Sequence, residues 1–268
     1  MPQSSPPALK PKGRRLTRRQ FLAAALCSTP LGGWADARCI EPTWLRVKRL
    51  QLTQSAPKWR LVQISDIHHK GDDSYLESVV TQVNALAPDV VLFTGDLIEE
   101  AHFLEPALKH LSRIRSPVFG IPGNHDYWSR VSFDPIHKAL EGTGGGWLLD
   151  QSAVLKNGNL CIHGATCLGH ASTLLEPRSG MKNVLLIHYP GWVEKVKPGW
   201  DLILAGHSHG GQVRIPFYGP IILPFAVGKY DMGYFDTPNG SLYVNPGIGW
   251  FPVPIRFNCR PEITLIEL

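Results

Sequence analysis

The chain has 268 residues, of which 43% are apolar and 18% are charged, and this balance excludes an intrinsically disordered protein. Its 26 glycines and 23 prolines follow no repeat, so a collagen-like chain is excluded as well. The formal net charge of +5 lies within residues 1–37, and the other 21 basic and 21 acidic residues cancel. Because a protein that coats nucleic acid needs a basic face, this neutral body predicts no nucleic-acid partner.

Residues 1–37 have the features of an export signal. The twin-arginine motif has a close counterpart at residues 17–22 (TRRQFL), and a short apolar run follows at 22–26. Ala35-Asp36-Ala37 has the small-x-small form of a signal-peptidase site, so cleavage after Ala37 and retention as an N-terminal anchor are both open. An ordinary basic tail is the simpler alternative. We expect the twin-arginine translocase as a partner, with export to the periplasm or the outer face of the cytoplasmic membrane, or membrane anchoring if the signal is kept.

Strands and helices alternate through the first half of the body. Short apolar runs indicate strands, and apolar residues that recur on one face indicate helices. These patterns predict elements at residues 60–65, 73–87, 89–94, 103–114 and 117–121, and a helix near Asp134. Three strand–helix units in a row imply parallel strands joined by helical crossovers.

Strands predominate in the second half. Six are predicted, at residues 153–156, 160–164, 183–187, 201–205, 241–245 and 262–267. Asn157-Gly158 and Asn239-Gly240 are typical of hairpin turns. No internal repeat or linker is visible, so residues 41–268 are expected to form one α/β domain with two packed sheets.

Polar side chains that suit metal binding follow five of the predicted strands. They are Asp66 and His68, Asp96, Asn124 with His125 and Asp126, His188, and His207 with His209. Because the carboxyl ends of strands in α/β sheets converge on one crevice, these side chains are expected to meet there. A glycine precedes Asp96, Asn124 and His207, and it permits a sharp turn with the backbone close to the site.

Asp, Asn and His ligands without cysteine favour divalent Mn, Fe or Zn. Seven ligand side chains from this list are more than one ion needs, and they fit two ions about 3.5–4 Å apart that share one carboxylate. Each motif alone is common in proteins, but all of them in this order after successive strands are not expected by chance. The sequence therefore predicts a dinuclear metal centre.

The ordered set resembles the calcineurin-like metallophosphoesterases over about residues 59–268. The resemblance implies two packed mixed β-sheets flanked by helices, in an α/β/β/α layering. The metal ligands that it implies are Asp66, His68 and His209 for one ion, Asn124, His188 and His207 for the other, and Asp96 between both. It also implies that His125 faces the leaving group of the substrate.

The implied chemistry is the hydrolysis of a phosphoester. Water bound to such ions ionises near neutral pH, and the hydroxide would attack phosphorus in line with the leaving oxygen. Asp96 would hold the two ions, and His125 would protonate the leaving oxygen or contact a phosphoryl oxygen. Asp126 either orients His125 or caps the following turn, and both interpretations stay open.

Residues 206–216 and 255–265 narrow the resemblance to exported bacterial members of the family. One activity in that branch is the hydrolysis of UDP-2,3-diacylglucosamine, in lipid A biosynthesis. The leading expectation is a phosphodiesterase with a small-molecule or lipid-linked phosphoester as substrate, associated with the envelope or a membrane surface. The alternatives are the lipid A pyrophosphatase and a catalytically silent surface binding protein.

Residues 212–235 are rich in aromatic and aliphatic side chains separated by Pro and Gly. They form either an apolar flap for acyl chains or a membrane, or a cover over the sheet edge, and Trp147 and residues 250–252 allow the same two interpretations. Candidate phosphate contacts are Arg130, Arg178 and Arg214, and a surface charge is the simpler interpretation of each. The cysteines beyond the leader form no C-x-x-C pair and are expected to be buried apolar residues, while export would allow a disulfide among Cys39, Cys161, Cys167 and Cys259.

Overall fold

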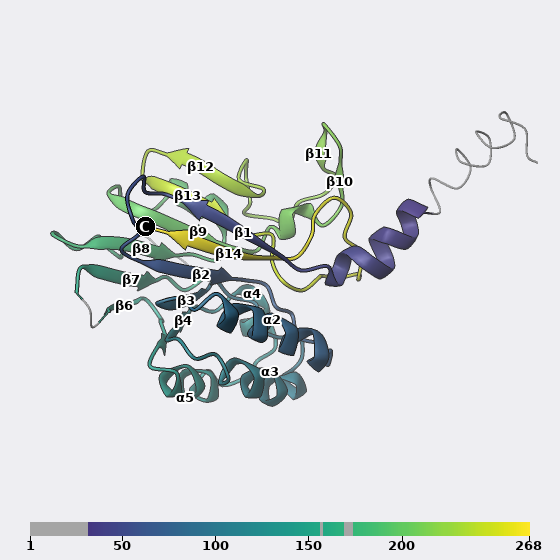
Figure 1. The fold of residues 1–268 in the computed structure, drawn as a ribbon, viewed down its shortest axis with the longest axis horizontal. Coiled ribbons are helices and arrows are strands. Elements are labelled where there is room, and N and C mark those ends of the chain that lie inside the picture. Colours follow the sequence, from purple (N-terminus) through teal and green to yellow (C-terminus); the bar gives the residue numbers. More distant parts are fainter. Residues whose placement is uncertain (1–31, 156–157, 169–173) are drawn as a thin grey trace, which may run out of the picture.

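The structure, a computed structural model, describes residues 32–155, 158–168 and 174–268. One six-stranded sheet has the order β1-β14-β2-β3-β4-β5 (Figure 1). Its strands are β1 (Arg46–Gln51), β14 (Glu262–Glu267), β2 (Arg60–Ile64), β3 (Val90–Phe93), β4 (Val118–Gly120) and β5 (Gly146–Trp147). β2 to β5 run parallel, as the strand–helix units predict, whereas β14 is antiparallel to β2 and parallel to β1.

The second sheet also has six strands, in the order β12-β13-β9-β8-β7-β6. They are β12 (Gly233–Thr237), β13 (Gly240–Val244), β9 (Trp200–Ala205), β8 (Lys182–Leu186), β7 (Leu160–Gly164) and β6 (Gln151–Val154). The four central strands are parallel, and each edge strand is antiparallel to its neighbour. β12 turns into β13 at Asn239-Gly240, as predicted, while residues 156–157, between β6 and β7, lie outside the described residues.

Helices cover the outer face of the first sheet (Figure 1). They are α2 (Asp73–Ala85), α3 (Leu104–Leu111) and α5 (Asp134–Gly142), and the short α4 (Asn124–Trp128) follows β4. α2 begins where the Asp72 carboxylate accepts a hydrogen bond from the Tyr75 amide at 3.0 Å, which caps the first turn. It ends at Ala85, two residues before Ala87 takes a φ of 44° ahead of Pro88.

The core has layers because successive side chains of a strand point to opposite faces. In β2, Val62 packs toward the helices and Leu61 packs toward the second sheet. The outer face of the second sheet is covered by the short 3-10 helix η5 (Pro190–Glu194) and by loops. Two mixed sheets flanked by helices confirm the expected α/β fold, with a thin fourth layer on the second sheet.

Three strands at the sheet edges, β1, β5 and β12, are absent from the sequence prediction. The alternation of charged and apolar residues in β1 is too weak to indicate a strand. β12 begins within the apolar stretch of residues 212–235, which hides its pattern. That stretch is therefore not one flap. It begins with a small hairpin, β10 (Arg214–Ile215) and β11 (Gly219–Pro220), and ends by adding a strand to the second sheet.

Trp147 is buried in the core on the helix side, stacked 6.1 Å from the Phe93 ring centre, so its role is packing. Cys161, Cys167 and Cys259 are buried, Cys39 is exposed, and all four are free thiols. Among the described residues, no helix combines the length and apolar character that crossing a bilayer requires.

Candidate metal centre

Strands of both sheets end at one cluster of polar side chains. The cluster consists of Asp66 and His68 after β2, Asp96 after β3, Asn124 after β4, His188 after β8, and His207 and His209 after β9. All seven side chains belong to buried residues. The structure thus brings together every side chain that the sequence singles out as a metal ligand, from elements that span both sheets.

Five of these seven residues have backbones in the left-handed region. Their φ angles are 49° at Asp66, 44° at His68, 60° at Asp96, 65° at His207 and 50° at His209. This conformation costs a residue other than glycine on the order of 1–3 kcal/mol. The surrounding structure holds it in place, since the Asp66 carboxylate accepts a hydrogen bond from the His207 amide at 3.0 Å. Strain of this kind clusters at functional sites.

Two glycines let the backbone approach the cluster closely. A Cβ on Gly123 would lie 2.1 Å from Oδ1 of Asp96, and a Cβ on Gly206 would lie 2.5 Å from Oδ2 of Asp66. Both distances are far shorter than side chains tolerate, so only glycine fits. This explains why glycine precedes Asn124 and His207 in the sequence.

The first group of converging atoms comes from Asp66, His68 and His209. The Nε2 atoms of His68 and His209 lie 3.0 Å apart, and each lies within 3.9 Å of Oδ1 of Asp66. Two ring nitrogens and a carboxylate oxygen therefore face one point. Such a set of imidazole and carboxylate donors is suited to a divalent cation.

The second group comes from Asp96, Asn124, His188 and His207. His188 donates its Nδ1 proton to the Thr94 carbonyl at 2.7 Å, which leaves Nε2 directed at Oδ1 of Asn124, 3.1 Å away. His207 donates through Nε2 to the Phe225 carbonyl at 2.9 Å, so its Nδ1 is free to bind a metal. Backbone acceptors that fix the tautomer in this way are typical of metal-binding histidines.

Asp96 connects the two groups. Its Oδ2 lies 3.3 Å from Nε2 of His188 and 3.5 Å from Nε2 of His68. No other carboxylate among the described residues is shared by two of the converging groups in this way. The arrangement therefore has the form that a carboxylate bridge between two cations requires.

The pKa shifts of the rings agree with this donor set. Burial, followed by the charge of His188, lowers the pKa of His207 to about 3, and burial lowers the pKa of His209 well below its ordinary value. Both rings are therefore neutral and keep a lone pair for a metal. At His188, burial favours the neutral ring, but Asp96 outweighs it and raises the pKa to about 9.

The two carboxylates shift in opposite directions. Burial raises the pKa of Asp66. Burial acts on Asp96 in the same sense, but His188 and the other nearby rings outweigh it and lower its pKa. A proton on His188 and a divalent cation are thus alternative ways of balancing the charge of Asp96, and metal binding would release protons. The residues present fit two divalent ions.

Glu99 is a site residue that the sequence analysis misses. Its Oε1 is hydrogen-bonded to Nδ1 of His68, and its Oε2 lies 3.0 Å from Nδ1 of His125. Burial would raise its pKa, but the hydrogen bonds from His125 and His68 outweigh burial and lower the pKa to about 2. One carboxylate therefore orients a candidate ligand and the candidate proton donor together.

The sequence offers no local signal that separates Glu99 from Glu100. Both follow the apolar pair Leu97-Ile98, yet the Glu99 side chain is 14% exposed and the Glu100 side chain is 70% exposed. Only the turn after β3 decides which of the two carboxylates points into the site.

His125 lies at the edge of the cluster, at the start of α4. Its amide donates to Oδ1 of Asp96 at 2.8 Å, and Glu99 holds its Nδ1. Burial would lower the pKa of His125, but the hydrogen bond to Glu99 and the charge of Asp96 outweigh it and raise the pKa. The protonated ring is thus favoured.

Of the two roles considered for Asp126, orienting His125 or capping a turn, the structure shows the capping role. Its carboxylate accepts hydrogen bonds from the amides of Gly123, Asp96 and Leu97 at 2.8–2.9 Å. Burial, followed by the charge of Asp96, raises its pKa to about 7. Glu99 rather than Asp126 orients the His125 ring. Asp126 instead fixes the backbone turns that carry Asp96 and Asn124.

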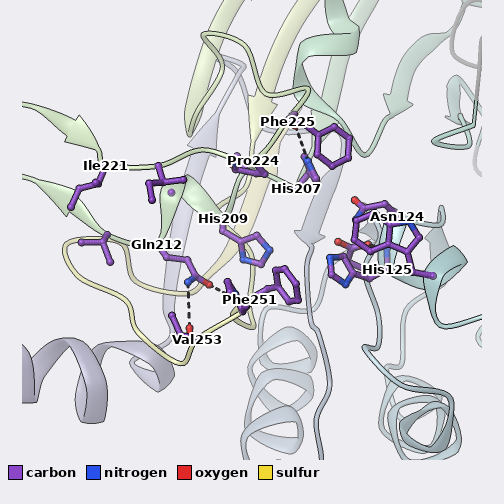
Figure 2. A pocket seen from close by; sticks show the side chains of 17 residues that line it. Asn124, His125, His207, His209, Gln212, Ile221, Pro224, Phe225, Phe251 and Val253 are labelled. Atoms are coloured by element: carbon purple, nitrogen blue, oxygen red, sulfur yellow. Dashed lines mark hydrogen bonds between the residues drawn. The ribbon is translucent and has the colours of Figure 1, made fainter.

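An apolar cavity of about 550 Å³ opens beside the cluster (Figure 2). Its polar floor includes Asp96, Asn124 and His125. Its walls come from residues 211–213, 221–225 and 251–253 and from Trp128, and they are mostly apolar. A phosphoester held at the floor would therefore place a neighbouring apolar group against these walls.

The three candidate phosphate contacts, and the histidine that follows His68, lie outside this cavity. Arg130, Arg178 and Arg214 do not line it, and Arg214 is paired with Asp231 at 2.8 Å. His69 points its Nε2 at Asp73, 3.2 Å away, and joins no converging group. None of these three arginines is therefore a lining residue of this cavity.

One family profile matches the chain. It is the calcineurin-like phosphoesterase family, and the match covers residues 60–211, more than half of the chain. The chain belongs to this family. The matched segment runs from β2 through η6 (His209–Gly211) and contains all seven converging residues and His125. The protein is therefore a metallophosphoesterase, a hydrolase of phosphoester bonds.

Three relatives match nearly the whole chain. The uncharacterized metallophosphoesterase YkuE of Bacillus subtilis is 31% identical, over 95% of this chain and 98% of that protein. The phosphodiesterase YaeI of Escherichia coli is 27% identical, over 94% and 99% respectively. The UDP-2,3-diacylglucosamine pyrophosphatase LpxG of Chlamydia trachomatis is 29% identical, over 90% and 94%. Family membership favours the enzyme over the catalytically silent alternative.

Proposed function

We propose that the protein is a dinuclear-metal-dependent phosphodiesterase for an amphipathic substrate of the membrane or envelope. The observation that carries the proposal is the position of Asp96, which lies beside both converging groups at the floor of an apolar cavity. When bound, two Mn, Fe or Zn ions would activate solvent as the nucleophile and stabilise charge on the phosphoryl oxygens. The residues that would hold them are Asp66, His68 and His209, and Asn124, His188 and His207, with Asp96 between the two sets.

His125 is the residue that would handle the leaving group. Glu99 engages its Nδ1 and favours the protonated ring, so Nε2 is the ring nitrogen available to a substrate in the cavity. A proton donated from Nε2 to the departing oxygen would neutralise the charge that develops there. Glu99 acts as a positioning residue in this scheme, because it sets the orientation and the protonation of His125.

A second candidate function is the hydrolysis of UDP-2,3-diacylglucosamine. The observation that favours it is the apolar wall beside the site, because this substrate carries acyl chains close to its phosphates. The relative LpxG, whose name states that activity, matches 90% of this chain. The substrate's nucleotide is made in the cytoplasm, so this candidate requires an uncleaved anchor that leaves the domain facing inward.

The proposal is tested with Mn-loaded protein and two aryl phosphates. Hydrolysis of bis(p-nitrophenyl) phosphate that Asp96→Asn abolishes is the expected result. Turnover of the monoester p-nitrophenyl phosphate alone, or diester turnover that survives in Asp96→Asn, would contradict the proposal. Release of UMP from UDP-2,3-diacylglucosamine by the same preparation would select the second candidate.

Export stays a prediction, because residues 1–31 lie outside the described residues. The twin-arginine translocase as partner, and an envelope location, follow from the motif at residues 17–22. Fractionation of cells that produce the Arg18→Lys, Arg19→Lys double variant tests both. We expect the variant to accumulate in the cytoplasm, and unchanged fractionation would count against this route.

A further inference from the structure

Exposed apolar side chains gather beside the cavity. Most of the large ones in the described residues lie on three segments, which together we call the apolar rim: residues 32–44, 213–225 and 250–254. Prominent examples are Trp34, Trp44, Phe217, Tyr218, Ile222 and Phe251. Single exposed apolar residues are ordinary, but a contiguous set marks a binding surface.

Hydrogen bonds join the three segments into one surface. The Gln212 side chain, at the base of the β10–β11 hairpin, accepts a hydrogen bond from the Phe251 amide at 2.7 Å. The loop that contains residues 250–254 continues to Arg256, whose amide donates a hydrogen bond to the Ala37 carbonyl at 2.9 Å. The buried carboxylate of Glu41 accepts a further hydrogen bond from the amide of Asn258 in the same loop. The hairpin and the N-terminal helix, which includes η1 (Asp36–Ile40) and η2 (Glu41–Thr43), project from the same end of the molecule (Figure 1).

The hairpin and loop segments of the rim carry basic but no acidic residues, whereas its N-terminal segment contains Asp36 and the buried Glu41. Residues 212–230 and 246–261 contain no Asp or Glu, whereas they include basic residues such as Lys229 and Arg260. The Arg260 guanidinium lies 3.8 Å from the centre of the Trp44 ring. Aromatic side chains with neighbouring cations and without acids are typical of protein surfaces that lie in the headgroup region of a bilayer.

The tip of the β10–β11 hairpin has two exposed aromatic residues, one of them in an unfavourable backbone conformation. Phe217 and Tyr218 are largely or fully exposed, and Phe217 has a φ of 67°. A bulky residue is unfavourable in this left-handed conformation, where Gly or Asn would be stable. The exposed side chain of Phe217 packs against no part of the fold, although its backbone is strained. The residue is therefore better explained by an interaction with a partner outside the molecule.

The N-terminal segment reaches the structure at the rim. Residues 1–31 contain six basic residues and no acidic one, and they join the described chain at Gly32. The bond after Ala37 lies within a helix, where Ala37 is buried and its carbonyl is hydrogen-bonded. Proteolysis favours exposed, extended segments, so this packing protects the candidate cleavage site.

We infer that the apolar rim docks the protein on a lipid bilayer containing anionic headgroups, so that the cavity receives its substrate directly from the membrane. The inference deepens the proposed function and rests on it for the substrate. Phe217 and Tyr218 insert at the tip of the hairpin, and the described basic residues next to the rim, Lys229 and Arg260, contact lipid phosphates. The apolar chain of an amphipathic phosphoester would then lie along the cavity wall, with its phosphate at the floor.

Vesicle binding by the full-length protein tests the inference. The test variant is Phe217→Asn, Tyr218→Ser, because Asn tolerates the left-handed backbone and neither residue lines the cavity. The matched control is Val154→Ser, an exposed apolar residue of β6 that lies outside the rim. Sedimentation is measured with vesicles of phosphatidylglycerol and phosphatidylethanolamine, and with vesicles of phosphatidylcholine alone.

We expect the wild-type protein and the control to sediment with the anionic vesicles, and the test variant to bind about tenfold more weakly or worse. Equal binding by the test variant would assign the interaction to residues 1–31, which all three proteins contain, and would overturn the inference. A lack of binding by the wild type, or a dimer that only the test variant fails to form, would overturn it as well.

Turnover of bis(p-nitrophenyl) phosphate separates this inference from the proposed function. The soluble diester reports on the metal centre alone, and all three proteins are expected to hydrolyse it equally. Vesicle binding without any turnover would contradict the proposed function and leave the docking surface in place. Turnover without rim-dependent binding would contradict the docking surface only.

Discussion

The cluster of seven candidate metal ligands, which forms the floor of the site, and the apolar rim are built in opposite ways. The floor comes from the ends of buried strands in both sheets, and five of its backbones are held in a left-handed conformation by their surroundings. The rim comes from a hairpin, a loop and the N-terminal helix, and its apolar side chains are exposed. The difference indicates that the core positions the candidate metal ligands, whereas the proposed docking and substrate selection depend on segments at the surface.

His207 is the point where the two regions touch. It extends from β9 into the floor, and its Nε2 donates to the carbonyl of Phe225, whose side chain lines the cavity. A change in the rim backbone at Phe225 would therefore reach the floor through this hydrogen bond. Changes to rim side chains further out, such as Phe217, have no such path in the structure.

The largest effect is expected from Asp96→Asn. The change removes the carboxylate that both converging groups share, so turnover of the diester should fall by at least roughly 10³-fold. Circular dichroism should show an unchanged fold. The control is Glu100→Gln, an exposed acid in the same loop, which should behave as the wild type. Comparable losses in both variants would show that the floor is not organised around Asp96.

Gly123→Ala should damage the floor through geometry alone. The added Cβ would lie 2.1 Å from Oδ1 of Asp96, so Asp96 must move and metal affinity should fall about 10–100-fold. Isothermal titration with Mn measures this change. Gly142→Ala at the end of α5 is the control, because its Cβ meets no atom within 4 Å. Wild-type affinity in Gly123→Ala would contradict the close packing of the floor.

Glu99→Gln should lower kcat by roughly 10–100-fold with little change in KM. The Glu99 carboxylate favours the protonated ring of His125, so its removal lowers the pKa of His125. Because the proton donor acts in its protonated form, the alkaline decline of kcat should begin at a lower pH in the variant. An unshifted profile, with Glu100→Gln again as the control, would separate Glu99 from proton transfer.

The smallest effect on catalysis is expected from Ile222→Ser. Ile222 lines the apolar wall without contacting the cluster, so the variant should bind an acylated diester several-fold more weakly, at an unchanged kcat. Kinetics with acylated and unacylated diesters measure the difference. Equal KM values for the acylated diester in variant and wild type would show that the wall does not select the substrate.

The sequence was sufficient to predict which side chains converge at the floor. Each ligand candidate directly follows a short apolar strand, so the local pattern and the rule that parallel strands end at one edge bring Asp66, Asp96 and His188 together. Glycines before the turns added a second local signal, which the structure explains by close contacts at Gly123 and Gly206.

The rest depended on contacts between residues far apart in the chain. Glu99 and Glu100 are equivalent in the sequence, and only the path of the loop after β3 turns Glu99 toward His68 and His125. The capping role of Asp126 likewise depends on three amides from two loops. β12 was hidden in an apolar stretch, because an edge strand takes its conformation from the neighbour that it pairs with.

Anomalous diffraction from crystals grown with Mn tests the central claim most directly. Two divalent ions at the floor, one on each side of Asp96, should give two anomalous peaks, the first beside His68 and His209 and the second beside His188 and His207. Two peaks in these positions would establish the dinuclear centre. A single peak, or peaks away from Asp96, would contradict it.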